Sequence, residues 1–127
     1  MLDTDSVSFA LRGEGHVGKR ILEHRPSQLC ISSITVAELR YGVERRKSPR
    51  LHALVDTFIS SVAIVAFDES SARSFGALAA NLASRGVPIG DFDVLIAAHA
   101  IAISAVLVTN NTKHFTRVQG LVVENWL

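Results

Sequence analysis

The chain has 127 residues, of which 48% are hydrophobic and 20% charged, and its formal net charge is +1. This length fits one domain with a substantial core, so we expect residues 1–127 to form a single domain. A mean hydropathy of +0.29 favours a compact α/β domain over disorder. The only cysteine, Cys30, excludes an internal disulfide and a cysteine-based zinc site.

The first residues do not resemble a secretory signal, because Asp3 and Asp5 interrupt them. The longest apolar stretch, residues 94–108, contains His99 and Ser104 and falls short of the roughly 20 apolar residues that a membrane span requires. We therefore expect a cytoplasmic protein without membrane contacts.

The N-terminal half predicts two short strands and three helices. A stub of strand ends at Asp3, which would suit a helix cap. Asp5 is better placed to cap a helix over residues 6–11, and this leaves Asp3 free for a site. Residues 29–32 predict a strand and residues 33–46 a helix, which either Ser33 caps or a capping box of Thr35 and Glu38 begins. The next helix begins at Ser48-Pro49, since proline suits the first helical turn.

The C-terminal half continues the alternation of strands and helices. Residues 62–67 form a β-branched run that predicts a strand, and Asp68 then caps a helix that ends near Arg85. A helix over residues 90–103 is apolar on nearly every face, which is typical of a buried central helix. Two further strands are expected, at residues 105–108 and 121–123.

This alternation predicts a parallel sheet with helices on both faces. Ligands of such folds bind beyond the carboxyl ends of the strands. Asp3, Glu38 and Asn110-Asn111 all follow strands, so we expect them along one edge of the sheet. The helix that starts at Asp91 and Asp93 can point its N-terminus at the same edge.

Four acids lie beside apolar runs, where an ionised carboxylate is costly unless a cation compensates it. They are Asp3, Glu38, Asp91 and Asp93. If the fold gathers them, a hard divalent ion such as Mg²⁺ is the natural partner. A metal-dependent enzyme acting on phosphates is therefore the leading hypothesis. Each acid also has a structural explanation, namely helix capping for Asp3, Glu38 and Asp91 and interaction with the helix dipole for Asp93.

A basic cluster follows Glu38, and a group of histidines is spread along the chain. The cluster fits a solvated helix end, a grip on RNA phosphates, or both; its members are Arg40, Arg45, Arg46, Lys47 and Arg50. The histidines show no ligand spacing, and His99 is expected to be a core or crevice residue. Asn111 alone is typical of a turn.

Four segments of the chain together resemble the VapC-type PIN-domain ribonucleases, the toxins of bacterial toxin–antitoxin pairs. The matching segments are Leu2-Asp3-Thr4-Asp5, residues 31–42 (ISSITVAELRYG), Pro88-Ile89-Gly90-Asp91-Phe92-Asp93 running into residues 96–100, and residues 107–115 (LVTNNTKHF). They run from one end of the chain to the other, and four in this order are highly specific.

The resemblance implies a three-layer α/β/α PIN-like domain with a short, mostly parallel central sheet and an acidic pocket for Mg²⁺ or Mn²⁺. Carried over by position, Asp3, Glu38 and Asp93 are the metal-binding and catalytic acids, and Asp91 is a candidate for positioning a water. Candidate supporting residues are Thr4, Asp5, Thr109 and Asn111. The family further implies cleavage of RNA, most readily in loops such as those of tRNA, inhibition by a cognate VapB-type antitoxin, and a homodimer.

Three departures from the family pattern keep other functions open. Asn111 lies where many relatives have a fourth acid, Asp5 replaces a usual asparagine, and only two residues precede Asp3. A second hypothesis is therefore a binding module that keeps the fold but does not cut RNA. A third, a receiver-like phospho-acceptor domain built on Asp68 and Lys113, leaves Glu38 and Asp93 unexplained.

Overall fold

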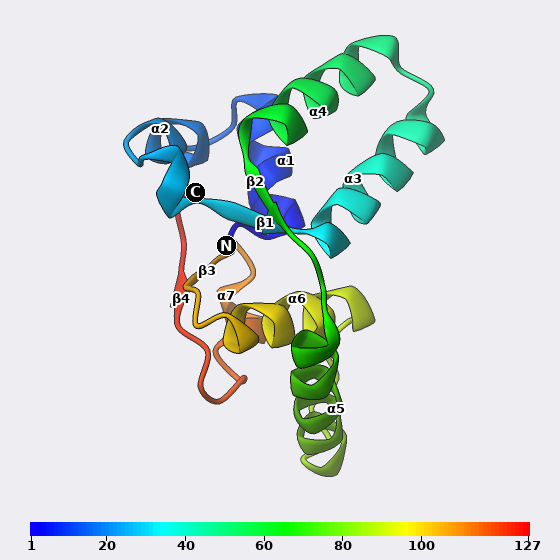
Figure 1. The fold of residues 1–127 in the computed structure, drawn as a ribbon, viewed down its shortest axis with the longest axis vertical. Coiled ribbons are helices and arrows are strands. Elements are labelled where there is room, and N and C mark those ends of the chain that lie inside the picture. The colour runs from blue at the N-terminus through cyan, green and yellow to red at the C-terminus, as the bar shows by residue number, and fades with distance from the viewer.

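A computed structural model describes all residues 1–127. Seven α-helices, one 3-10 helix and four short strands follow one another along the chain (Figure 1). Their bounds are α1 Thr4–Arg12, α2 Val17–Leu22, η1 Pro26–Gln28, β1 Cys30–Ser32, α3 Ser33–Arg46, α4 Pro49–Ser61, β2 Ala63–Val65, α5 Glu69–Ser84, α6 Asp91–Ala102, β3 Leu107–Val108, α7 Thr112–Phe115 and β4 Val123–Glu124.

The strands form two parallel pairs, β1–β2 and β3–β4, and Leu2 joins the pairs. Leu2 makes parallel bridges to Ile31 on one side and Val108 on the other. Its amide donates to the carbonyl of Cys30 over 2.9 Å, and the amide of Asp3 donates to Val108 over 3.0 Å. The order across the sheet is thus β2, β1, the Leu2 segment, β3, β4, which places Asp3 at the carboxyl end of the central segment.

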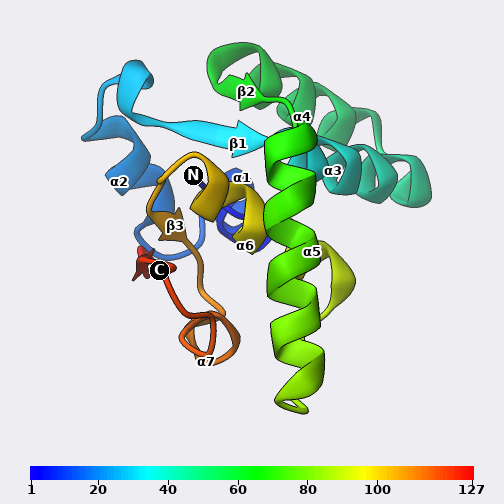
Figure 2. The same ribbon diagram turned by 60° about the horizontal axis from the view of Figure 1, so that its bottom comes forward.

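Two hydrophobic clusters pack on opposite faces of this sheet. Met1 and Leu107 belong to the cluster under α5, α6 and α7, whereas their neighbours Leu2 and Val108 belong to the cluster under α1 to α4. Successive residues of a strand point to opposite faces, so this division gives three layers. Helices α1–α4 occupy the upper part of Figure 1 and α5–α7 the lower part, and Figure 2 shows α5 standing in front beside α6.

Most of the expected elements are present, with bounds shifted by a few residues. Ser48 and Asp68 cap α4 and α5 as predicted, through bonds to the amides of Leu51 and Ser71. Helix α6 is buried on nearly every face, as its uniform apolarity predicted. The last strand, β4, begins two residues later than expected, and neither α2 nor α7 was predicted.

Two predictions about helix caps are wrong. Asp3, and not Asp5, caps α1, because its side chain accepts a bond from the amide of Ser6. Ser32 caps α3 through the amide of Ile34, so neither Ser33 nor a Thr35 capping box begins that helix. Glu38 therefore lies in the second turn of α3. None of the helices is long and apolar enough to cross a membrane.

Candidate active site

Asp3 is a buried carboxylate held by hydrogen bonds where the central strand segment meets α1. Its side chain is 2% exposed, and its Oδ1 accepts from the amide of Ser6 over 2.8 Å. Thr109, which follows β3, is near enough for its hydroxyl to lower the pKa of Asp3. Ser6 in turn donates from its hydroxyl to the carbonyl of Val108 over 3.1 Å. The end of β3 and the first turn of α1 thus fix this carboxylate from two sides.

Glu38 reaches the same edge of the sheet from α3. The hydroxyl of Thr4 lies 2.6 Å from Glu38 Oε1 and 3.3 Å from the hydroxyl of the buried Thr35. Since the carboxylate can only accept, Thr4 donates to it. Thr4 is the first residue of α1, directly after Asp3, so the Thr4–Glu38 bond brings the two acids to the same place.

Asp93 completes the group from the first turn of α6. Asp93 is half-buried. Its charge raises the pKa of Glu38, and the charge of Asp3 raises the pKa of Asp93. His114, in α7, is the one basic group among the causes of its pKa shift and lowers that pKa. The three acids therefore come from three segments of the chain, at residues 3, 38 and 93, as the strand-end argument predicted.

Burial and mutual repulsion hold all three acids above their ordinary pKa. Burial is the largest cause for Asp3, Glu38 and Asp93 alike. The bonds from Thr109 and Ser6 lower the pKa of Asp3, and the Thr4 bond lowers that of Glu38. Asp5, which is exposed on α1, raises the pKa of all three. No Lys or Arg forms an ion pair with any of the three.

This donor set suits a hard divalent cation in its chemistry. Carboxylate oxygens are the ligands that Mg²⁺ and Mn²⁺ prefer, and a cation would relieve the repulsion. No group of three Asp, Glu, His or Cys side chains is placed to hold one ion. The acids nevertheless repel one another, because charge repulsion acts over a longer range than a metal–oxygen bond of about 2.0–2.6 Å. The side chains would have to rotate inward to share an ion.

The structure does not bring Asp91 to this centre. Asp91 is exposed and lines a separate surface pocket of about 230 Å³ with residues of α5, among them Phe75 and Leu82. Its charge is absent from the causes that shift the pKa of Asp3, Glu38 or Asp93. Two residues apart on a helix, Asp91 and Asp93 point about 200° from one another, so only one of them can face the acidic centre.

The remaining supporting residues lie around the acids, together with three that the sequence did not indicate. Thr4 and Thr109 contact Glu38 and Asp3 as described. The side chain of Asn111 does not cap α7. Its nitrogen Nδ2 lies 2.9 Å from His114 Nδ1, and the Asn111 backbone amide donates to Thr109 Oγ1. The residues that the sequence analysis missed are Ser6, Thr35 and His114. Only their position beside the motif residues could have indicated them.

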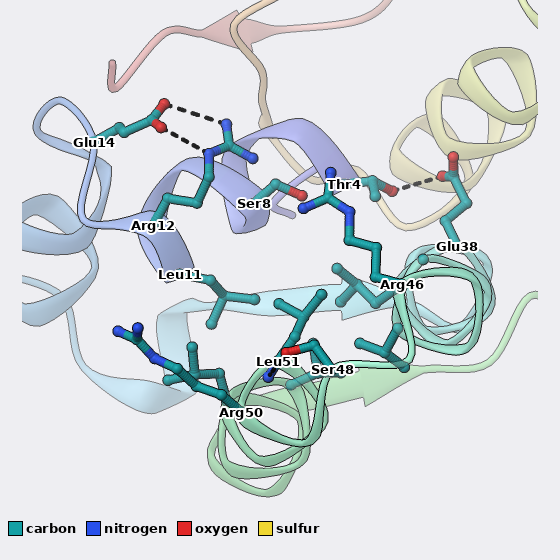
Figure 3. A pocket seen from close by; sticks show the side chains of 15 residues that line it. Thr4, Ser8, Leu11, Arg12, Glu14, Glu38, Arg46, Ser48, Arg50 and Leu51 are labelled. Carbon is teal, nitrogen blue, oxygen red and sulfur yellow. Dashed lines mark hydrogen bonds and ion pairs between the residues drawn. The ribbon is translucent and has the colours of Figure 1, made fainter.

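A groove of about 590 Å³ leads away from the acidic centre between α1, α3 and α4. Thr4 and Glu38 lie at one end, as Figure 3 shows. Its other lining residues are Ser8, Leu11, Arg12, Glu14, Leu39, Gly42, Val43, Arg46, Ser48, Arg50, Leu51, Leu54 and Val55. The groove thus joins an acidic end to an apolar middle and a basic rim.

The basic cluster is divided among different surfaces. Arg46 and Arg50 line the groove, and in Figure 3 Arg46 reaches from α3 toward Ser8 of α1. Arg40 pairs with Asp56 of α4, and Arg45 lies over the ring of Tyr41 on α3. Lys47 lines another surface pocket with His52, away from Glu38. Of the five residues, only Arg46 and Arg50 share a groove with a site acid.

Comparison with known proteins identifies the fold. The model of the PIN domain matches residues 1–121. The tRNA(fMet)-specific endonuclease VapC of Salmonella typhimurium is 37% identical over 127 residues, which cover 99% of this chain and 96% of that protein. The ribonuclease VapC2 of Rickettsia felis is 38% identical over 129 residues, again covering 99% of this chain and 96% of that protein.

Solved structures agree. The DNA-bound VapBC of Salmonella typhimurium matches with a TM-score of 0.92 at 39% identity, covering 100% of this chain and 97% of that chain. VapBC2 of Rickettsia felis bound to a promoter DNA fragment matches with a TM-score of 0.90 at 38% identity, covering 100% and 98%. The expected α/β/α fold is thereby confirmed, and the chain belongs to the PIN-domain family and, within it, to the VapC proteins.

Proposed function

We propose that this chain, as one domain, is a metal-dependent endoribonuclease and the toxin of a VapBC-type toxin–antitoxin pair. The observation that carries the proposal is the meeting of Asp3, Glu38 and Asp93, three acids that no Lys or Arg compensates, at the carboxyl edge of the sheet. Two of its relatives are a tRNA(fMet)-specific endonuclease and a ribonuclease, which supports RNA as the substrate and tRNA as the class to try first.

Asp3, Glu38 and Asp93 would together hold Mg²⁺ or Mn²⁺. When bound, such an ion supplies positive charge beside the scissile phosphate and lowers the pKa of a water. The protein's own contribution is to hold the acids in place. The Ser6 amide orients Asp3, and the Thr4 hydroxyl orients Glu38. The Thr109 hydroxyl lowers the pKa of Asp3 and so favours its charged form. His114 lowers the pKa of Asp93 and so favours its charged form.

The groove offers a path for the RNA backbone. Arg46 and Arg50 line it together with Glu38, so phosphates on one side of the cut would meet positive charge along the groove. We expect an unpaired strand rather than a duplex, because splayed nucleotides expose single phosphates. Arg40 and Lys47 face other surfaces and are not part of this path.

The same groove is where we place the inhibitory segment of a VapB-type antitoxin. Its middle is apolar, with Leu11, Leu51 and Leu54 among the lining residues, and its end is Glu38. An apolar segment lying there would cover both the acidic centre and the two arginines. Inhibition then follows from competition with RNA for one groove. The homodimer that the family resemblance implies stays a prediction, to be checked by molar mass in solution.

The direct test is cleavage of tRNA in Mg²⁺ by the wild type, Asp93→Asn and Glu44→Gln. Glu44 is an exposed acid on α3, the helix of Glu38, and serves as the matched control. We expect Asp93→Asn to lose at least about 100-fold in rate and Glu44→Gln to cleave as the wild type does. Cleavage by Asp93→Asn at the wild-type rate would refute the assignment. A wild type that binds Mg²⁺ and its antitoxin but cuts no RNA would instead support the binding-module alternative.

A further inference from the structure

His99 is a fully buried histidine that the proposed chemistry does not use. It lies in α6, six positions after Asp93, and its side chain is 0% exposed. Its Nδ1 is 2.8 Å from the hydroxyl oxygen of Ser32. Its Nε2 is the one buried side-chain nitrogen or oxygen in the structure without a hydrogen-bond partner. Packing alone does not explain a histidine here, because an apolar side chain would fill the space without an unpaired polar atom.

The hydrogen bonds around Ser32 assign the proton on this ring. Ser32 Oγ already accepts from the amide of Ile34, over 3.0 Å, as the cap of α3. If Ser32 donates its hydroxyl hydrogen to His99 Nδ1, the hydroxyl is fully used and only Nε2–H is unpaired. The reverse arrangement leaves both the Ser32 hydrogen and the Nε2 lone pair unpaired. Because each unpaired buried group is costly, His99 is the Nε2–H tautomer and accepts from Ser32.

The groups around His99 give its ring no second hydrogen-bond partner. The ring of Phe67 meets it edge-on, with centroids 5.5 Å apart at 83°. Burial is the largest cause that shifts the pKa of His99, and it lowers that pKa. Asp68 is the one charged group that acts on His99, and its charge raises the pKa. Asp68 Oδ1 accepts from the amide and the hydroxyl of Ser71, each over 3.0 Å, and Asp68 forms no hydrogen bond with His99. Ser32 is therefore the only polar side chain that holds the ring.

This bond joins the two helices that carry acids of the candidate site. His99 follows Asp93 by six positions in α6, and Ser32 precedes Glu38 by six positions, at the start of α3. Six residues of helix span about 9 Å, so the bond lies less than two helical turns from each acid. Resting on the proposed function, we propose that His99 is a positioning residue: by accepting a hydrogen bond from Ser32 it fixes the spacing of α6 and α3 at which Asp93 and Glu38 share one divalent ion.

Two substitutions separate this role from packing. His99→Asn places an amide oxygen near the position of Nδ1 and keeps an acceptor for Ser32. His99→Leu fills the core with an apolar side chain and removes the acceptor. We expect His99→Asn to bind Mn²⁺ as the wild type does, and His99→Leu to lose about 10-fold or more in affinity while its melting temperature stays equal or rises. Equal Mn²⁺ affinity of the two variants would overturn the proposal.

The Ser32→Ala substitution tests whether the effect runs through this bond. In a Ser32→Ala background the difference in Mn²⁺ affinity between His99→Asn and His99→Leu should vanish. The Ser32 hydroxyl is then absent, so the amide oxygen of Asn has no bond to accept and offers no advantage over Leu. A difference that persists would overturn the proposal, because it would place the cause elsewhere in the core. A KM and kcat comparison on RNA adds a second readout, in which His99→Leu should lower kcat and leave the KM for RNA near the wild-type value.

Two measurements need neither metal nor RNA, and so separate a failure here from a failure of the proposed function. Crystal structures of both variants report the Cα separation of Glu38 and Asp93, which His99→Asn should keep within about 0.5 Å and His99→Leu should not. Nitrogen-15 NMR of the wild type at pH 7 should show His99 as the neutral Nε2–H tautomer. The Nδ1–H tautomer, a charged ring, or an unchanged separation in His99→Leu would overturn the proposal even if RNA cleavage is confirmed.

Discussion

The hydroxyl of Thr4 donates to Glu38 Oε1 over 2.6 Å and so joins the first residue of α1 to the second turn of α3. It is the direct hydrogen bond between the segments that carry Asp3 and Glu38. It also acts against burial and the charge of Asp93, both of which raise the pKa of Glu38. The ionised state of Glu38 therefore depends on a residue that holds no ion itself.

Removing this hydroxyl should make Glu38 harder to ionise. In Thr4→Val we expect the pKa of Glu38, followed by carbon-13 NMR of its carboxyl group, to rise further above the ordinary value of 4.5. Mn²⁺ affinity at pH 6 should fall about 10-fold, because protons then compete more strongly for the carboxylate. Thr4→Ser keeps the hydroxyl and is the control. An unchanged Glu38 titration in Thr4→Val would show that the bond does not tune this acid.

Asp3 combines a structural and a chemical role, and two substitutions separate them. Asn is as good a helix cap as Asp and removes a charge that burial disfavours, so without divalent ions at pH 7 Asp3→Asn should keep α1 and be at least as stable as the wild type in urea unfolding. Asp3→Ala should lose about 1–2 kcal/mol of stability, because the amide of the buried Ser6 loses its partner. Both variants should lose Mn²⁺ binding. Asp3→Asn that binds Mn²⁺ like the wild type would limit Asp3 to capping.

The three raised pKa values predict how stability depends on pH when chelator removes divalent ions. An acid whose pKa is higher in the folded than in the unfolded state binds more protons when folded, so the stability it contributes is lost as pH rises. The loss begins near the ordinary values of 3.8 for Asp3 and Asp93 and 4.5 for Glu38, and ends above their raised values. The melting temperature should therefore fall across this window and recover on addition of Mn²⁺ at pH 7.

Asp93→Asn is the matched variant for this pH dependence. It removes one of the repelling charges, so in chelator its melting temperature should exceed that of the wild type at pH 7 and approach it at low pH, where the carboxyl groups are protonated. Mn²⁺ should no longer stabilise it. A wild type whose stability rises with pH between about 4 and 7 relative to Asp93→Asn would show that these acids are compensated in solution.

How far the sequence predicts this structure depends on whether the deciding contacts are local. The caps Ser48 and Asp68 and the uniform apolarity of α6 act within a few residues, and all three were predicted. Asp3 and Asp5 are both suitable caps for α1. The choice depends on Leu2, which pairs with strands about 30 and 106 residues away. Such pairing cannot be predicted from local propensity.

The candidate site shows the same division. That Asp3 and Glu38 follow strands, and that α6 can point its N-terminus at the same edge, was predicted because parallel strands end together, and the charges of Asp3 and Asp93 do act on Glu38. Asp91 was also predicted near the acids but lies elsewhere, because the sequence alone did not determine which face of α6 faces them. His114 was missed because α7 is only four residues long and has no helical periodicity. Its place beside Asp93 comes from tertiary packing alone.

The groove between α1, α3 and α4 gives a prediction about inhibition. Leu54 lines it and is 37% exposed. Leu54→Asp should weaken binding of the chain's VapB-type antitoxin at least tenfold, or about 1.4 kcal/mol, because it buries a charge in the apolar middle of the groove. Binding is measured with purified antitoxin and without RNA, because the same groove is the proposed path of the RNA. Leu22→Asp, at an 87% exposed leucine of α2 outside the groove, is the control. Antitoxin affinity equal to the wild type would place the partner on another surface.

The most direct test of the shared metal site is titration of Mn²⁺ into the chain by calorimetry, without RNA, for the wild type, Asp93→Asn and Glu44→Gln. If Asp3, Glu38 and Asp93 hold one ion together, the wild type and Glu44→Gln will show the same single site. Asp93→Asn will then bind at least about 10-fold more weakly. Equal affinity in all three proteins, or no binding by the wild type at neutral pH, would contradict the account.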